Sequence, residues 1–599
     1  MRIDRRRALS MFALGAIAAP DAASAKAAQA YRGKIRFDHG VASGDPTSDG
    51  VLLWTRVTPV GDAGASIPVS WEVATDAVFA RVVSRGATRT DAGRDWTVKA
   101  EANGLKPGTD HHYRFRVGAA VSPTGRAKTL PVGPVADVVL AVTTCALYPA
   151  GFFNAYAHMA AAERLDAVIE LGDYIYEYGA EVGKYGMEAG RKLGRIPEPA
   201  HDIVTLADYR TRYAQYRREP ELQAAHARAA WICIWDDHET ANDSWAGGAE
   251  NHDASEGPWI DRERAALRAY YEWMPIRDPQ PGKAFEAINR SFAFGDLASV
   301  IMLESRLMAR AYQLELSRDG DITQTVYVIG EKGVRTPLAD RAAAAAMMRA
   351  GPLPAGHVLG PDLEAVHERI WNPDRQMLGP VQEQWLAQEM QASVKAGRPW
   401  QVLGSGTVMA KRMNPDVYAM MGEATVNGLI TRQPPEQRKY AQSMADSFRY
   451  RLPFELDSWN GYPAARERVY DAVKTAGPAA NALVISGDSH AFWGCELHDE
   501  AGLRVATELG SSSVTSPSLG DQAGGVQIGA VFTAQNKEVK FCDQLAKGYM
   551  RLTLTPGEAK TEMIAVPHLV RTTDAKTLAT FRVRPTKTLG SGPLERVTG

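Results

Sequence analysis

Four hydrophobic segments of the sequence are each followed at once by side chains that can bind a metal ion or transfer a proton. In chain order these are Cys145 after VVLAVTT, Asp173 and Tyr176 after DAVIELG, a run from Asp236 to Asp243 after WICIW, and Asp488 with His490 after NALVISG. Strand ends are where α/β folds place binding sites, because the side chains there project beyond the sheet edge into a crevice. The four segments together therefore predict one shared site.

The segment GDYIY (172–176) offers two anionic oxygen ligands. Gly172 permits a tight turn, and Asp173 emerges at the strand end. Tyr176 lies on the same side as Asp173 if a turn or a short helix follows. The structural alternative is that Asp173 caps a helix above packed tyrosines.

The segment WDDHETANDSW (235–245) places six acidic, amide or imidazole side chains between two tryptophans: Asp236, Asp237, His238, Glu239, Asn242 and Asp243. A solvated acidic loop is the alternative, but Trp235 and Trp245 indicate a partly buried pocket. In GDSH (487–490), Asp488 and His490 are two residues apart and so point the same way from a strand end. Four such strand ends in one domain indicate a shared functional site far more specifically than any one of them does alone.

The order Cys145, GDYIY (172–176), WDDHE (235–239) and GDSH (487–490) resembles the PhoD-type alkaline phosphatases. These are similar in plan to purple acid phosphatases and other calcineurin-like metallophosphoesterases. The resemblance extends to FDHGVASGDPTSDGVLLWTRVTP (37–59), LGPVQEQWL (378–386) and DSWNGYPAARERV (457–469), and so covers most of the chain.

The resemblance implies two cofactors, Fe³⁺ and Ca²⁺. The iron ligands would be Cys145, Asp173, Tyr176 and His490, and thiolate and phenolate donors do stabilise ferric iron. Asp173 would bridge to calcium, a hard cation that takes oxygen ligands, and Asp488 stands where purple acid phosphatases have a histidine. The loop ligand for calcium stays open: alignment with the relatives' GNHE picks Asp237, whereas the need for a neutral amide picks Asn242.

The implied reaction is hydrolysis of a phosphate ester by a metal-bound hydroxide. His238 is the candidate for contacting the phosphate or protonating the leaving group, and its alternative is to orient a metal ligand. Arg306 either binds substrate phosphate or forms an ion pair on a helix face. Glu239, Asp243, Tyr174 and Tyr178 are expected to pack around the site. The serines of GSGT (404–407) and GSSSVTS (510–516) lack a GxSxG nucleophile elbow, which disfavours a serine nucleophile.

The elements that must position these residues differ along the chain. Residues 31–134 contain short alternating segments between Gly, Pro and Asp turns, which predict an all-β, fibronectin type III-like domain. Residues 135–599 alternate apolar strands with alanine-rich helices. This pattern predicts an α/β layered metallophosphoesterase β-sandwich flanked by helices. Within it, residues 308–378 are expected to be an insertion of loops, without a strong strand, around one helix at LADRAAAAAMMRAG.

The composition of the 599 residues excludes some classes of protein. A net charge of −2 with no basic cluster beyond the N-terminus gives no nucleic-acid-binding surface. The four cysteines are too few for a disulfide scaffold, and no spacing fits structural zinc. Cys233, in AAWICIW, is expected to be an inert buried thiol, whereas Cys495 and Cys542 could form one bridge.

Residues 1–30 are predicted to be a cleaved export signal, with a basic start, a short apolar run and a small-residue site at 23–25. The run is shorter than a membrane span needs. Arg5-Arg6-Arg7 resembles a twin-arginine signal, and an ordinary Sec signal is the alternative. A periplasmic or secreted location and the twin-arginine machinery as a partner follow from this interpretation.

The leading hypothesis is an exported, metal-dependent phosphoesterase that hydrolyses monoesters and possibly diesters. A phospholipase D-like phosphodiesterase of the same family is the nearest alternative. A catalytically inactive cell-surface binding protein is the alternative from another class.

Overall fold

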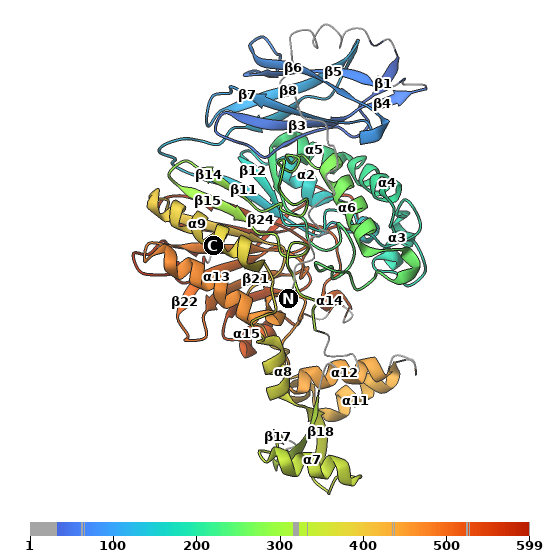
Figure 1. Cartoon of the computed structure of the whole chain (residues 1–599), viewed down its shortest axis with the longest axis vertical. Coiled ribbons are helices and arrows are strands. Elements are labelled where there is room, and N and C mark those ends of the chain that lie inside the picture. The colour runs from blue at the N-terminus through green and yellow to red at the C-terminus, as the bar shows by residue number, and fades with distance from the viewer. Residues whose placement is uncertain are drawn as a thin grey trace.

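The computed structural model describes residues 31–597 except 32, 62, 63, 65, 315–322, 332–333, 434, 436–437, 523–524 and 526. The predicted export signal at residues 1–30 lies outside the described residues. Figure 1 shows a β-rich domain at one end, a layered body in the middle, and a small module at the other end. In the described part of the chain, no helix has the length and apolar character needed to cross a membrane.

The N-terminal domain is all-β, as predicted. One of its layers has the strand order β10 (Gly125–Lys128), β8 (Asp110–Val117), β5 (Ile67–Ala74) and β6 (Val82–Thr90), with β9 (Ala120–Val121) beside β8. The opposing layer consists of β2 (Val41–Gly44), β3 (Gly50–Arg56) and β7 (Thr97–Asn103). A separate short pair joins β1 (Lys34–Arg36) to β4 (Thr58–Val60). In β8 every second residue is buried, which is the pattern of a strand with one face on a core.

The second layer of this domain continues into the body of the protein. Strand β13 (Ala230–Cys233) pairs in parallel with β2, with Ala230 opposite Ser43 and Trp231 opposite Gly44. The resulting ten-stranded sheet has the order β27-β26-β25-β24-β11-β12-β13-β2-β3-β7. Its remaining strands are β11 (Val138–Thr143), β12 (Ala167–Glu170), β24 (Gly548–Leu554), β25 (Ala559–Ala565), β26 (Lys576–Val583) and β27 (Glu595–Arg596). One sheet therefore crosses the domain boundary predicted at residue 134.

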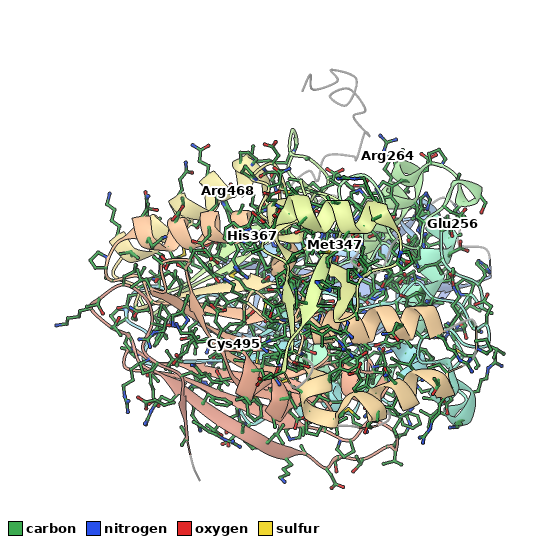
Figure 2. The ribbon with its side chains drawn as sticks, turned by 90° about the horizontal axis from the view of Figure 1, so that it is seen from below. Glu256, Arg264, Met347, His367, Arg468 and Cys495 are labelled. Carbon is green, nitrogen blue, oxygen red and sulfur yellow. The ribbon has the colours of Figure 1, made fainter. Side chains whose placement is uncertain are left out.

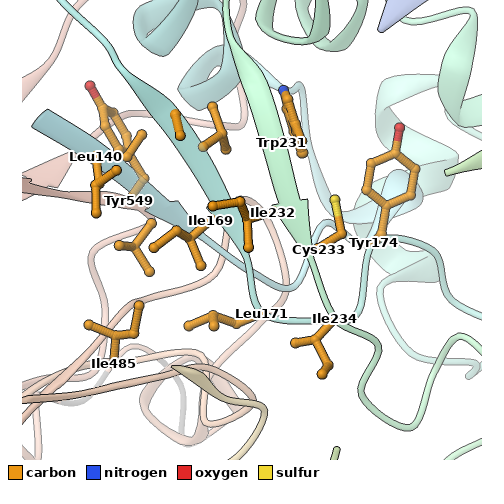
Figure 3. Packing of buried hydrophobic residues seen from close by; sticks show 14 of the residues in the cluster. Leu140, Ile169, Leu171, Tyr174, Trp231, Ile232, Cys233, Ile234, Ile485 and Tyr549 are labelled. Atoms are coloured by element: carbon orange, nitrogen blue, oxygen red, sulfur yellow. The ribbon is translucent and has the colours of Figure 1, made fainter. Parts of the chain in front are cut away.

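A second sheet of seven strands completes the sandwich of the body. Its order is β14 (Arg290–Phe294), β15 (Ala298–Met302), β19 (Trp400–Ser405), β20 (Ala482–Ser486), β22 (Arg504–Gly510), β21 (Phe492–His498) and β23 (Val539–Asp543). Figure 3 shows Leu140 and Ile169 of the first sheet in one core cluster with Ile485 of the second. The near-continuous apolar strands are thus buried on both faces, as the sequence predicted.

Helices cover the outer faces of the sandwich. On the first sheet lie α2 (Asn154–Ala160), α4 (Leu206–Arg217), α5 (Pro220–Arg228) and α6 (Trp259–Trp273), and α3 (Met187–Leu193) packs against the short turn Tyr148–Ala150. On the second sheet α9 (Gly379–Lys395) packs beside α13 (Pro463–Ala476), and α14 (Leu519–Gln522) and α15 (Gly529–Gln535) lie further along the chain. This arrangement confirms the predicted α/β sandwich flanked by helices and preceded by an all-β domain.

The insertion contains strands that the sequence analysis did not predict. Three antiparallel strands, β16 (Gln324–Ile329), β17 (Arg335–Pro337) and β18 (His357–Pro361), form a small sheet with α7 (Arg341–Ala350) and α8 (Leu363–Ile370). The expectation of no strong strand was wrong because each of these strands is short and buries at most two residues, and so lacks a long apolar run. The predicted helix at LADRAAAAAMMRAG is confirmed as α7.

A second segment of the chain, residues 417–452, lies beside this small sheet. Helices α10 (Val417–Met421), α11 (Glu423–Arg432) and α12 (Arg438–Arg449) lie against it, and the ring of Tyr450 lies 4.8 Å from that of Tyr327. We call residues 323–371 and 417–452 the peripheral module. Figure 2 views the protein from this end, with Met347 of α7 and His367 of α8 labelled.

The four cysteines are all free and buried. Cys233 lies in the core cluster shown in Figure 3, in agreement with its predicted role as a buried thiol. Cys495 and Cys542 lie on the paired strands β21 and β23 without forming the bridge that the sequence left open.

Candidate metal centre

The strand-end side chains predicted from the sequence meet at one edge of the two sheets. Cys145 follows β11, Asp173 follows β12, Asp236 and Asp237 follow β13, and Asp488 and His490 follow β20. Their ligand atoms form three groups, each within 4.8 Å: Cys145, Asp173 and His490; Asp173, Asp237 and His238; and Asp173, Asp236, Asp237 and Asp488. Asp173 belongs to all three groups, so it is the centre of the site.

Four of these residues have strained backbones. The φ angles are +59° at Cys145, +58° at Asp173, +64° at Asp488 and +55° at His490. The left-handed region costs a residue with a Cβ about 1–2 kcal/mol, and such strain clusters at functional sites. Each strand therefore turns sharply at its ligand, which directs the side chain inward.

Gly172 makes one of these turns possible. Its φ is +105°, and a Cβ at this position would lie 2.4 Å from Cβ of Asp236. The turn after β12 thus passes directly against the first acidic residue after β13. Glu239 holds the same two segments together, because its carboxylate accepts hydrogen bonds from the backbone N–H groups of Asp173 (3.0 Å) and Asp236 (2.9 Å).

The first ligand group consists of Cys145, Asp173, Tyr176 and His490. The Cys145 thiol donates to Oδ2 of Asp173 at 3.3 Å, and the Tyr176 hydroxyl donates to the same oxygen at 3.0 Å. The Tyr176 hydroxyl also lies 3.1 Å from Nε2 of His490. A thiol, a carboxyl, a phenol and an imidazole thus converge, although the turn that carries Tyr176 is not helical.

The surroundings of His490 fix which of its ring nitrogens faces the group. Nδ1 lies 2.8 Å from the carbonyl oxygen of Pro517, which can only accept, so Nδ1 carries the proton. Burial lowers the pKa of His490 to about 3. The ring is therefore neutral, and Nε2 presents a lone pair to the first ligand group, as a metal-binding histidine must.

The second ligand group consists of the carboxylates of Asp173, Asp236, Asp237 and Asp488. Burial and the neighbouring carboxylates raise the pKa of Asp173 well above its usual range, and burial, opposed by Arg306, raises that of Asp236 to about 6. Oδ1 of Asp237 and Oδ2 of Asp488 are buried without a hydrogen-bond partner. Buried carboxylate oxygens need a cation; Nη2 of Arg306, 3.5 Å from Oδ1 of Asp237, offsets part of this charge, and a metal ion among the carboxylates would offset more, so the residues fit a metal ion.

The two candidate calcium ligands from the loop differ in their placement. Asp237 belongs to the second ligand group. The side-chain oxygen of Asn242 instead accepts a hydrogen bond from Tyr178 at 3.0 Å, and its backbone N–H donates to Glu177. The geometry favours Asp237.

His238 lies beside both ligand groups. Its Nδ1 is 2.7 Å from Oε2 of Glu177, its Nε2 is 3.9 Å from Oδ2 of Asp237, and its ring stands 4.1 Å from the ring of Tyr176. Burial alone would lower the pKa of His238, but Asp237 and Glu177 raise it well above the usual value. The contact with Glu177 thus fixes the orientation of the imidazole at the edge of the site.

Arg306, the predicted substrate-binding residue, is fully buried in an ion-pair network. Its Nε lies 2.6 Å from Asp236, and its Nη1 lies 2.7 Å from Asp457. The segment is a loop and not a helix, so the ion pair forms with the site itself rather than along a helix face. This placement does not support a role of Arg306 in binding phosphate, because its guanidinium is already ion-paired with the carboxylates of Asp236 and Asp457.

Sequence reasoning gave no role to three residues at the site: Glu177, Asp457 and Ser516. The hydroxyl of Ser516 lies 2.7 Å from that of Tyr176. Glu177 is completely buried and holds His238, yet it stands in GDYIYEYG like any acidic residue of a loop. Asp457 lies in the DSWNGYPAARERV segment, which the resemblance had included without a role. Only the pairing with Arg306, 151 positions away, reveals its place.

Comparisons with known proteins agree with this fold. Residues 140–563 match the family model "PhoD-like phosphatase", and residues 22–131 match "PhoD-like phosphatase, N-terminal domain". The chain is 32% identical over 546 residues to alkaline phosphatase D of Bacillus subtilis (strain 168), covering 89% of this chain and 78% of that relative. A solved structure titled "Structure of PhoD" superimposes with a TM-score of 0.71 at 29% identity, covering 95% and 93% of the two chains.

These matches define the protein's class: it is a hydrolase of phosphoric esters. Within that class, the chain belongs to the PhoD-like phosphatase family. The resemblance seen in the sequence motifs is thereby confirmed.

The placement of Glu177 predicts the behaviour of one variant. Glu177→Gln leaves His238 buried but removes the charged partner of its Nδ1, so we expect phosphatase turnover to fall about 10- to 100-fold, the range typical when a residue that orients a side chain of a metal site is removed. The loss should be greater for alkyl phosphates than for p-nitrophenyl phosphate, whose leaving group needs no proton. Glu181→Gln, in the exposed part of the same segment, is the control. Equal losses on both substrates would contradict a role through His238.

Proposed function

We propose that this protein is an exported alkaline phosphatase of the D type that works with Fe³⁺ in the first ligand group and Ca²⁺ in the second. The observation that carries the proposal is the sharing of Asp173 between the two groups. A thiolate and a phenolate favour ferric iron, whereas a set of carboxylates alone favours a hard cation such as calcium.

The roles of the residues follow from this assignment. When bound, the two cations would supply Lewis acidity that activates water and neutralises phosphoryl charge. Asp173 would bridge them, and Asp488 with Asp236 or Asp237 would complete the calcium side. His238 would donate a proton to the departing alkoxide or a hydrogen bond to the phosphate. Arg306 would hold Asp236 in place through the ion pair.

Two alternative functions can be tested by experiment. A phosphodiesterase of the phospholipase D type would use the same centre with another pocket. An inactive binding protein would keep the fold without turnover, but all the side chains expected for the two cations lie together. The second alternative is therefore the weaker of the two.

Metal analysis combined with two substrates tests the proposal. We expect iron and calcium in the purified protein, a visible charge-transfer band, and faster turnover of p-nitrophenyl phosphate than of bis-p-nitrophenyl phosphate. A calcium chelator should stop turnover, and Ca²⁺ but not Mg²⁺ should restore it. A colourless, iron-free and fully active enzyme would refute the iron assignment. Faster turnover of the diester would favour the phosphodiesterase, and no turnover of either substrate would favour the binding protein.

Cys145→Ala tests the thiolate ligand. We expect loss of activity by at least about 100-fold, with iron content reduced and the fold kept, because metal ligands contribute more than the residues that orient them. Cys233→Ala removes an equally buried thiol away from the site and should retain activity. Full activity in Cys145→Ala would mean that this cysteine only packs.

Export can be tested at the paired arginines. Replacing Arg5 and Arg6 by lysine keeps the positive charge, so a Sec signal would still work, whereas a twin-arginine signal would fail. We expect the variant to accumulate in the cytoplasm, measured by fractionation and immunoblot. Normal export of the variant would indicate the Sec route.

A further inference from the structure

The segment GSSSVTS, which the sequence analysis set aside for lack of a nucleophile elbow, borders the metal centre. We call residues 511–517, directly after β22, the serine loop. All of its side chains from Ser511 to Ser516 are at most 1% exposed. A buried hydroxyl must find a hydrogen-bond partner, so the partners of this loop show what it holds.

Its partners are the segments that carry the first ligand group. The hydroxyl of Ser512 donates to the backbone oxygen of His490 at 3.1 Å, and that of Ser516 lies 3.0 Å from the backbone oxygen of Cys145. The backbone N–H of Val514 donates to Thr144 at 3.1 Å. The carbonyl of Pro517 is the acceptor that orients His490. The serine loop thus ties two strand ends of different sheets together.

One contact reaches a ligand atom itself. Oγ of Ser516 lies 2.7 Å from the hydroxyl oxygen of Tyr176, and both side chains are buried. The other two groups at hydrogen-bond distance from that oxygen are Oδ2 of Asp173 and Nε2 of His490.

Neither of those two groups can donate to an ionised tyrosine. A carboxylate only accepts, and Nε2 of His490 carries a lone pair because the proton is on Nδ1. Ser516 is therefore the remaining donor among these three neighbours once Tyr176 has lost its proton to bind a metal. Its hydroxyl can turn from the Cys145 carbonyl to the phenolate, at similar distances.

We propose that Ser516 is a positioning residue that donates a hydrogen bond to the phenolate of Tyr176 and so tunes its strength as an iron ligand. This rests on the proposed function, which places Fe³⁺ in the first ligand group. A hydrogen bond to a ligand atom withdraws electron density from it, and such contacts are a lever on the potential of a bound metal. Ser516 thus makes Tyr176 a weaker donor and the iron easier to reduce.

The test is the visible spectrum and the reduction potential of the iron-loaded protein. Ser516→Ala should shift the phenolate charge-transfer band to longer wavelength and lower the reduction potential. Ser516→Thr, which keeps the hydroxyl, should restore both values. Ser511→Ala is the matched control, because its equally buried hydroxyl contacts backbone oxygens of Val142 and Ser512 and no ligand atom.

The outcomes distinguish failure of the role of Ser516 from failure of the proposed iron-dependent function on which it rests. An unchanged band and potential in iron-loaded Ser516→Ala would overturn the role of Ser516 alone. Wild-type protein without iron would refute the proposed function, and this assignment with it. Should Ser516→Ala fail to fold, resonance Raman spectra of the wild-type protein in water and in D₂O decide. A deuterium shift of the Tyr176 phenolate mode supports the hydrogen bond, and the absence of a shift overturns it.

Discussion

Mutual repulsion among buried carboxylates is the constraint on which the site depends. The carboxylates of Asp173, Asp236 and Asp237, which are buried, converge with that of Asp488, which is half-buried, and like charges this close destabilise one another strongly. Arg306 and His238 offset part of this charge, and a cation between the carboxylates would offset the rest. The strand ends bring these carboxylates together, and the cationic side chains reduce the repulsion between them.

The strands of the β-sandwich are the rigid elements that bring the carboxylates together. Parallel strands of the first sheet and the central strands of the second end at the same edge, and left-handed turns direct the ligands inward. Glu239 and the serine loop then join neighbouring strand ends through hydrogen bonds between side chains and the backbone. The strain at four ligand residues is thus balanced by strong local anchoring, which is the arrangement expected where geometry serves chemistry.

The sequence predicted the parts of this design that are local. A hydrophobic strand followed by Asp, Cys or His is visible in a few consecutive letters, so the sequence predicted the α/β class correctly and singled out the segments whose side chains the structure brings together. Contacts between distant segments are not visible in this way. Three features each depend on which distant segments of the chain meet: the pairing of Arg306 with Asp457, the contact of Glu177 with His238, and the three short strands of the peripheral module. The same holds for the sheet that crosses residue 134, because nothing in β2 or β13 reveals that they are partners.

That shared sheet bears on how such a chain could evolve. Pairing between β2 and β13 leaves no free strand edge at the point where the two domains meet. An exchange of genes that cut at residue 134 would separate two halves of one hydrogen-bonded ladder, and would expose an edge prone to pairing with other chains. The N-terminal domain is therefore expected to be inherited with its catalytic partner, rather than traded between proteins as an independent unit.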